Sequence, residues 1–165
     1  MTDWVRVSVL AGAVLTLGAA PAPNAALLKA IQGDLTAKGP AAVLKTYFNC
    51  DGGKGYALVE TGDAAAVALA ARLMKGADAC YAEGVGSSLG VAMSRNPTAV
   101  LPLVNSGVGL AAAQICLPFL SAEDPPAKTQ AALARTRAAL AKVTAPALAR
   151  QKAACLAVVA GASKP

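Results

Sequence analysis

Histidine is missing from this sequence of 165 residues. Its absence excludes the Ser-His and Cys-His pairs of nucleophilic hydrolases and any metal site built on imidazole. No Ser-x-x-Lys motif supplies a substitute base, so acid–base chemistry would have to come from carboxylates. Glu60 and Glu83 are the candidate pair for a glycan-cleaving enzyme. Carboxylates in helical domains are more often solvated, and we therefore expect no catalytic residue, no metal ion and no cofactor.

Aromatic residues are also scarce, at 4% of the chain, whereas about a quarter of the residues are alanine. Such a composition has high helix propensity but little apolar area per residue, so the core would benefit from covalent bridges. Four cysteines are present, namely Cys50, Cys80, Cys116 and Cys155. They form no Cys-x-x-Cys pair, which excludes a thioredoxin-type motif and a close-spaced zinc knuckle.

An even number of cysteines in a chain that starts like an exported protein predicts two disulfides. Three pairings are possible, and the sequence alone does not choose between them. We favour Cys50–Cys80 and Cys116–Cys155, because each bridge then closes two consecutive helical units. The alternative is four reduced, buried thiols in a cytosolic protein.

No long uninterrupted apolar run follows the N-terminus: residues 100–120 are apolar but are broken by prolines, glycines and an asparagine. Residues 1–22 resemble a secretory signal, because Arg6 precedes the uncharged apolar run of residues 7–20. The cleavage position stays open. An uncleaved membrane anchor and a buried cytosolic helix are the alternatives. We expect one helical domain over residues 24–160, a frayed tail over 161–165 and no membrane span in the mature chain.

A period of 3.6 residues dominates after Asn24, and no stretch alternates like a strand. The sequence therefore predicts an all-α fold, a compact irregular bundle of about seven to nine short helices, with stacked helical hairpins as the alternative. Asn24, Asp63 and Asp78 are the expected N-caps. The expected helices cover residues 25–37, 41–49, 56–60, 64–75, 79–95, 98–104, 110–115 and 147–160, and one more begins at the start signal of residues 123–126 and runs through residue 143.

Acidic residues are absent from Pro125 onward, although the same segment holds seven basic ones and the whole chain carries a net charge of +6. Lys128, Arg135 and Lys142 recur every seven residues, which predicts one exposed helix face opposite Leu133 and Leu140. The candidate partner-binding residues are Lys128, Arg135, Arg137, Lys142, Arg150 and Lys152. Such a face is either ordinary solvated surface or a docking face for an anionic partner. In the cell envelope that partner would be an acidic protein, lipid or wall polymer, and not nucleic acid.

Glycine occurs three times inside the expected helix of residues 79–95, at Gly84, Gly86 and Gly90. Their spacing does not match a dinucleotide-binding motif, and the run Gly52-Gly53-Lys54-Gly55 does not have the spacing of a phosphate-binding loop. Each helical glycine costs about 1 kcal/mol relative to alanine, so we expect a compensating close contact or a ligand groove. Close packing is favoured.

Two resemblances follow from local motifs. Residues 77–101, with Ile115-Cys116 and residues 150–156, resemble a group of exported all-helical proteobacterial proteins to which no activity is attached. The pattern Cys80-Tyr81-x-x-Gly84-Val85, with residues 115–118, is similar to periplasmic immunity proteins that neutralise secreted amidases. No activity follows from the first resemblance. The absence of histidine and the shortage of catalytic candidates predict a non-catalytic periplasmic interaction or scaffold protein of the bacterial envelope. A periplasmic immunity or inhibitor protein that binds a hydrolase is the alternative, and the oligomeric state stays open.

Overall fold

The computed structural model describes residues 23–107, 109–118 and 123–163 of the chain. The expected signal over residues 1–22 lies outside these described residues. The described part consists of helices joined by turns and irregular segments, without a strand, which confirms the all-α prediction. The helices are α1 (Pro23–Tyr47), α2 (Lys54–Glu60), α3 (Ala64–Met74), α4 (Ala79–Arg95), α5 (Pro97–Val100), α6 (Ala112–Ile115), α7 (Pro126–Ala141) and α8 (Ala149–Ala162), with 3₁₀ turns at Leu101–Leu103 and Pro146–Leu148.

Helix α1 consists of two helical segments joined by a sharp break. Gly39 has φ 80° and ψ 174°, a conformation that glycine adopts easily, and Pro40 opens the second segment. The Tyr47 hydroxyl donates a hydrogen bond of 2.9 Å to the Asp34 carboxylate, so the second segment lies back against the first. The predicted separation of this region into two helical segments, one ending near residue 37 and the next starting at residue 41, is therefore confirmed.

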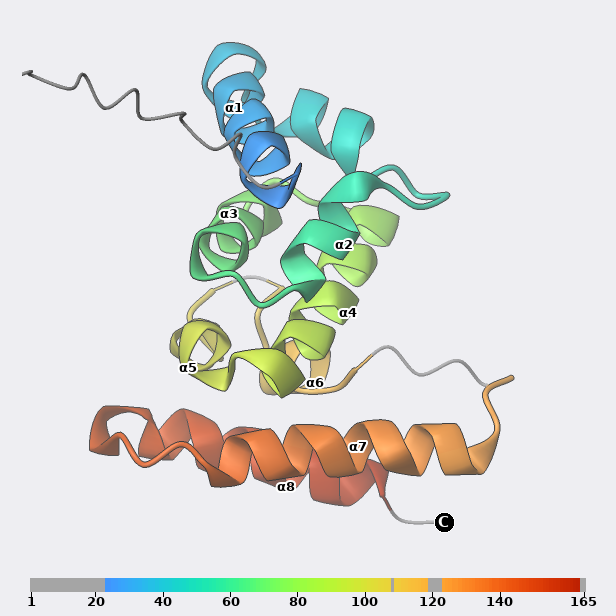
Figure 1. The fold of residues 1–165 in the computed structure, drawn as a ribbon, viewed down its shortest axis with the longest axis vertical. Helices are drawn as coiled ribbons and strands as arrows, with labels where there is room; N and C mark the ends of the chain where they lie inside the picture. The colour runs from blue at the N-terminus through green and yellow to red at the C-terminus, as the bar shows by residue number, and fades with distance from the viewer. Residues whose placement is uncertain (1–22, 108, 119–122, 164–165) are drawn as a thin grey trace, which may run out of the picture.

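The helices are arranged around α4, which contacts α2, α3, α5, α6 and α7. Figure 1 shows α7 and α8 lying side by side as a layer at one end of the molecule, with α1 at the opposite end. Helices that stack as successive hairpins would contact mainly their sequence neighbours. A central helix with five neighbours identifies the compact bundle and not the stacked hairpins.

One hydrophobic core runs from α1 to the layer of α7 and α8. Phe48, Leu89 and Met93 are fully buried in its middle, and Leu140 continues it into α7. Thr136 is buried as well, and its hydroxyl donates to the Ala132 carbonyl at 3.3 Å, which satisfies a polar group inside the bundle. The few bulky side chains thus lie where several helices meet.

Two of the three predicted N-caps differ from expectation. Asp63 caps α3 as predicted, since its Oδ1 accepts from the amides of Ala65 and Ala66, each at 2.9 Å. Asp78 occupies the N-cap position of α4 but makes no capping hydrogen bond, because the next residue, Ala79, has φ 32° and turns the chain away from regular first-turn geometry. Asn24 lies inside α1, which begins at Pro23.

The C-terminal helix is longer than predicted. Helix α8 runs through Ala162, so Gly161 and Ala162 are helical and do not belong to a frayed tail. Arg137 of α7 donates to the Ser163 hydroxyl at 2.9 Å, and that hydroxyl donates to the Val159 carbonyl at 2.7 Å. These two bonds fix the end of the helix.

Both expected disulfides are present. Cys50–Cys80 joins the segment after α1 to the first turn of α4, and Cys116–Cys155 joins the end of α6 to α8, with Cα–Cα distances of 5.6 and 5.2 Å. No cysteine is left free. Of the helices in the described ranges, none combines the length and the apolar character needed to cross a bilayer.

Candidate functional site

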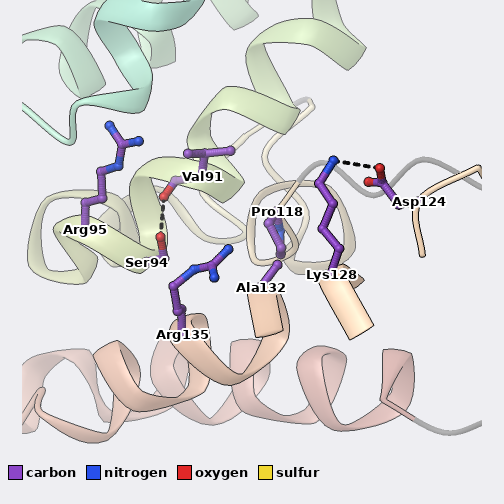
Figure 2. A pocket seen from close by; sticks show the side chains of 8 residues that line it. All are labelled: Val91, Ser94, Arg95, Pro118, Asp124, Lys128, Ala132 and Arg135. Carbon is purple, nitrogen blue, oxygen red and sulfur yellow. Dashed lines mark hydrogen bonds and ion pairs between the residues drawn. The ribbon is translucent and has the colours of Figure 1, made fainter. Parts of the chain in front are cut away.

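A cleft of about 520 Å³ lies between α4 and α7, and we call it the α4–α7 cleft. Figure 2 shows the side chains that form its walls. They are Val91, Ser94, Arg95, Pro118, Asp124, Lys128, Ala132 and Arg135.

Helical periodicity brings the α7 residues to this cleft. Lys128 and Arg135 are two turns apart, so both lie on the same side of α7, while Leu133 and Leu140 are fully buried in the core. Figure 2 shows Arg135 reaching from α7 toward α4, beside Pro118. Arg95 is the last residue of α4 and joins the cleft from the other wall.

The α4–α7 cleft is cationic. The Lys128 ammonium pairs with Asp124 at 2.7 Å, which balances one charge. Arg95 and Arg135 form no ion pair with any carboxylate of the described residues. The Ser94 hydroxyl donates to the Val91 carbonyl at 2.8 Å and keeps its lone pairs available to accept a hydrogen bond. The Arg135 guanidinium beside the apolar walls is therefore the main chemical feature of the site, whereas the Arg95 side chain at its edge points away from α7 in Figure 2 and also lines a second pocket with Asp63.

The other predicted partner-binding residues do not extend this site. Arg137 bonds to Ser163 near the end of α8. The Lys152 ammonium donates to the carbonyls of Val143, at 2.7 Å, and Ala141, at 3.4 Å, and so satisfies the C-terminal end of α7. Arg137 and Lys152 therefore form hydrogen bonds within the layer of α7 and α8 and do not line the α4–α7 cleft.

Arg150 and Lys142 lie apart from the cleft as well. Arg150 lines a separate pocket of about 190 Å³ with Val104 and Asn105, on the side of the Leu101–Leu103 turn. Lys142 is exposed at the C-cap of α7. The six basic residues that the sequence groups together therefore occupy several places, and only Lys128 and Arg135 line the α4–α7 cleft.

The glycines of α4 serve different purposes. A Cβ at Gly84 would collide with the ring of Tyr56, and one at Gly90 would collide with the backbone carbonyl of Leu117. Both positions allow close packing. Gly86 has ordinary space, with the Gln114 carbonyl 3.6 Å from an added Cβ, and lines a groove of about 360 Å³ between α4 and α6.

The two carboxylates of the candidate glycan-cleaving pair are not brought together in one cavity. Glu60 of α2 accepts a hydrogen bond of 3.4 Å from the Ser88 hydroxyl. Glu83 is exposed and lines the groove with Gly86, whereas Glu60 is not among the residues of that groove. No cluster of three or more cysteine, histidine or carboxylate side chains suited to a metal ion occurs within residues 23–107, 109–118 and 123–163.

Comparison with family models, with curated proteins and with solved structures finds no match to this chain. The resemblances to exported helical proteins and to amidase-immunity proteins therefore stay predictions from sequence.

Proposed function

We propose that the protein is a non-catalytic binding protein of the bacterial envelope, and that its α4–α7 cleft accepts an acidic segment of a partner protein. The observation that carries this proposal is the placement of Arg95 and Arg135 on the walls of one cleft without a carboxylate partner among the described residues. Two disulfides support an oxidising compartment, because such bridges persist outside the cytosol.

The chemistry of the cleft favours carboxylate ligands. A guanidinium is always charged, and its planar fork pairs with a carboxylate through two parallel hydrogen bonds. Asp124 neutralises Lys128, and neither arginine of the site pairs with a carboxylate among the residues that the structure describes. Val91, Ala132 and Pro118 add apolar surface, which suits a peptide in which acidic and apolar residues are mixed.

The shape of the site favours a protein segment over a flat anionic membrane. Arg135 lies in the hollow between two helices and beside Pro118, as Figure 2 shows, whereas a bilayer surface would contact the outermost side chains of α7. An extended acidic loop or terminus is narrow enough to enter a cleft of about 520 Å³ in part.

The test is capture of a partner from the solubilised envelope of the native host, with Arg135→Glu compared to the unchanged protein. We expect an acidic partner that is retained by the unchanged protein, lost as salt rises, and bound at least about tenfold more weakly by Arg135→Glu. Lys29→Glu is the control, because it makes the same change in net charge on the exposed surface of α1, at the far end of the bundle.

Equal capture by Arg135→Glu and the unchanged protein would contradict the proposed site. Binding to vesicles of anionic phospholipid, with no protein retained, would replace the protein partner with a lipid surface. If the retained partner is a hydrolase whose activity falls as the complex forms, the protein belongs among the immunity or inhibitor proteins.

A further inference from the structure

The two disulfides differ in their access to solvent. Cys50 is exposed and Cys80 is half-buried, whereas Cys116 and Cys155 are both fully buried, at 0% exposure. A thiolate must reach a sulfur atom to exchange with it, so the native fold protects only one of the two bridges. We infer that Cys50–Cys80 is a site of reversible thiol–disulfide exchange with a dithiol of the envelope, and that the attack takes place at Cys50.

Exposure favours Cys50 as the sulfur that is attacked, and the fold favours Cys80 as the sulfur that leaves. Cys80 lies in the first turn of α4, a helix of 17 residues, and the amide groups at a helix N-terminus stabilise a nearby thiolate. The carboxylate of Asp78 does not occupy these amides by capping the helix.

The exchange has two steps. The first thiolate of the dithiol attacks the Cys50 sulfur, the Cys50–Cys80 bond breaks, and Cys80 leaves with the electron pair and then takes up a proton. The second thiol of the dithiol loses its proton, attacks its own mixed disulfide and releases Cys50, which is protonated in turn. The protein bridge gains two electrons and two protons, and the dithiol is oxidised to a disulfide.

A cluster next to the bridge holds the two cysteines near each other after reduction. Phe48 is fully buried and packs edge-to-face on Tyr56, with ring centroids 5.2 Å apart. The Tyr56 hydroxyl donates to the Phe48 carbonyl at 2.6 Å, and the Tyr56 ring lies against Gly84 of α4. Phe48 is two residues from Cys50 and Gly84 is four from Cys80, so the cluster holds both ends of the reduced segment.

Reduction would therefore release a loop and leave the bundle folded. Residues 49–53 follow the buried Phe48, and Asp51 and Gly52 within them are exposed. The second bridge has no comparable freedom, because Cys155 is part of α8 and Cys116 ends α6, so its sulfur atoms become accessible only when these helices separate. Thiol–disulfide exchange therefore determines whether the surface loop of residues 49–53 is covalently attached to α4.

The experiment treats the native protein with increasing dithiothreitol, blocks free thiols with N-ethylmaleimide and identifies the labelled peptides by mass spectrometry. We expect label on Cys50 and Cys80 at least about tenfold faster than on Cys116 and Cys155, with an unchanged far-UV circular dichroism spectrum. Equal labelling of all four cysteines, or loss of helix together with the first bridge, would overturn the inference.

A monothiol tests the direction of attack. Reduced glutathione lacks the second thiol of a dithiol, so the mixed disulfide can be trapped by alkylating the freed cysteine with N-ethylmaleimide before it re-forms the bridge, and then located on a peptide. We expect glutathione on the peptide that contains Cys50, and glutathione on the Cys80 peptide would contradict the assigned order. After the reductant is removed and oxidised glutathione is added, the original mass should return without refolding from denaturant, whereas failure to re-form the bridge would end the claim of reversibility.

Discussion

At the scale of single residues, two glycines one helical turn apart have opposite surroundings. A Cβ at Gly90 would collide with the backbone of Leu117, whereas one at Gly86 would make an ordinary contact with the Gln114 carbonyl, at 3.6 Å. A neighbouring backbone cannot rotate away as a side chain can. Replacement by alanine should therefore change the free energy of unfolding in opposite directions at Gly90 and Gly86.

We predict that Gly90→Ala lowers the free energy of unfolding by about 1–3 kcal/mol, because the new methyl group forces α4 away from residue 117. Gly86→Ala is the control, and it should be neutral or stabilising by up to about 1 kcal/mol, since alanine favours the helix. Urea denaturation of both variants at one pH measures the difference. A loss for Gly86→Ala as large as that for Gly90→Ala would show that packing around α4 differs from this description.

A second feature at this scale is the contact of Asp34 with Lys38 and Tyr47. The Lys38 ammonium, 3.0 Å from Asp34, is the main reason that the pKa of this carboxyl is lowered from its ordinary value of 3.8, and the hydrogen bond from Tyr47 adds to it. The same hydrogen bond is the main reason that the pKa of Tyr47 is raised above 10.0, with burial second.

These shifts set the direction of two pH effects. A carboxyl whose pKa is lower in the folded state stabilises the fold above the unfolded pKa of 3.8, and this contribution disappears as the pH falls through the folded value. A phenol whose pKa is raised contributes below the unfolded value of 10.0, and its contribution disappears as the pH rises through the folded one.

We therefore predict that Asp34→Asn loses less stability than the unchanged protein when the pH falls below about 4, and that its Tyr47 titrates at lower pH. Urea denaturation as a function of pH tests the first expectation, and the ultraviolet absorbance of phenolate tests the second. Asp51→Asn is the control, because its carboxylate is exposed on the loop after α1. Identical pH profiles for both variants would contradict the prediction.

At the scale of helices, the two ends of α4 and the start of α3 show which features of a helix terminus the local sequence predicts. Helix α4 has the predicted bounds, since Asp78 precedes it and Asn96-Pro97 ends it. Of the three predicted N-caps, however, only Asp63 caps its helix through the side chain. A capping residue type predicts where a helix begins, but the bond itself depends on the backbone angles around it.

This difference gives a prediction for the two caps. Asp63→Ala should lower the free energy of unfolding by about 1 kcal/mol, because the amides of Ala65 and Ala66 lose their acceptor. Asp78→Ala should change it by less than about 0.5 kcal/mol, because no capping bond is lost. Thermal unfolding followed by circular dichroism compares the two, and a larger effect for Asp78→Ala would contradict the geometry of this helix start.

Helix α2 begins earlier than the sequence predicted, at Lys54 and not near Tyr56. Glycine disfavours helix, so the run of glycines before Tyr56 reads as a loop. In the structure, the ring of Phe48 lies where a side chain on Gly55 would be. Packing against a buried aromatic ring therefore outweighs the local preference, and nothing in the local sequence shows that contact.

The α4–α7 cleft was predicted only in part, because local sequence does not show which distant segments pack together. The seven-residue spacing of Lys128 and Arg135 correctly places both opposite the buried Leu133. Periodicity does not show which helix packs along the flank of α7, so the contribution of Arg95 was missed. Periodicity also gives no sign that Lys152 donates to carbonyl oxygens at the end of α7 and lies outside the cleft.

At the scale of the whole molecule, the bridges compensate for a core with few large side chains. They close loops with sequence separations of 30 and 39 residues. Loops of this length contribute about 3.5–4 kcal/mol each in the chain-entropy model, a large share of the roughly 5–15 kcal/mol that stabilises a typical domain. The pairing favoured from sequence, in which each bridge closes two consecutive helical units, is the one that the structure has.

We predict that Cys116→Ala with Cys155→Ala destabilises the protein by at least about 4 kcal/mol, because the loss of the bridge is accompanied by loss of buried sulfur packing between α6 and α8. Cys50→Ala with Cys80→Ala should cost less, since Cys50 is exposed. Urea denaturation of the two double variants measures both values. If the exposed pair proves the more important, the layer of α7 and α8 is held by contacts other than its bridge.

The four cysteines are joined in the order in which they occur, first to second and third to fourth, and neither covalent ring encloses or crosses the other. During synthesis the second partner of the first pair therefore becomes available before either member of the second pair. An oxidant that joins each cysteine to the preceding unpaired cysteine as the chain emerges therefore forms the native disulfides, Cys50–Cys80 first and Cys116–Cys155 second. The chain can thus acquire both of its cross-links in sequence, without passing through wrong pairs that would later have to be reshuffled.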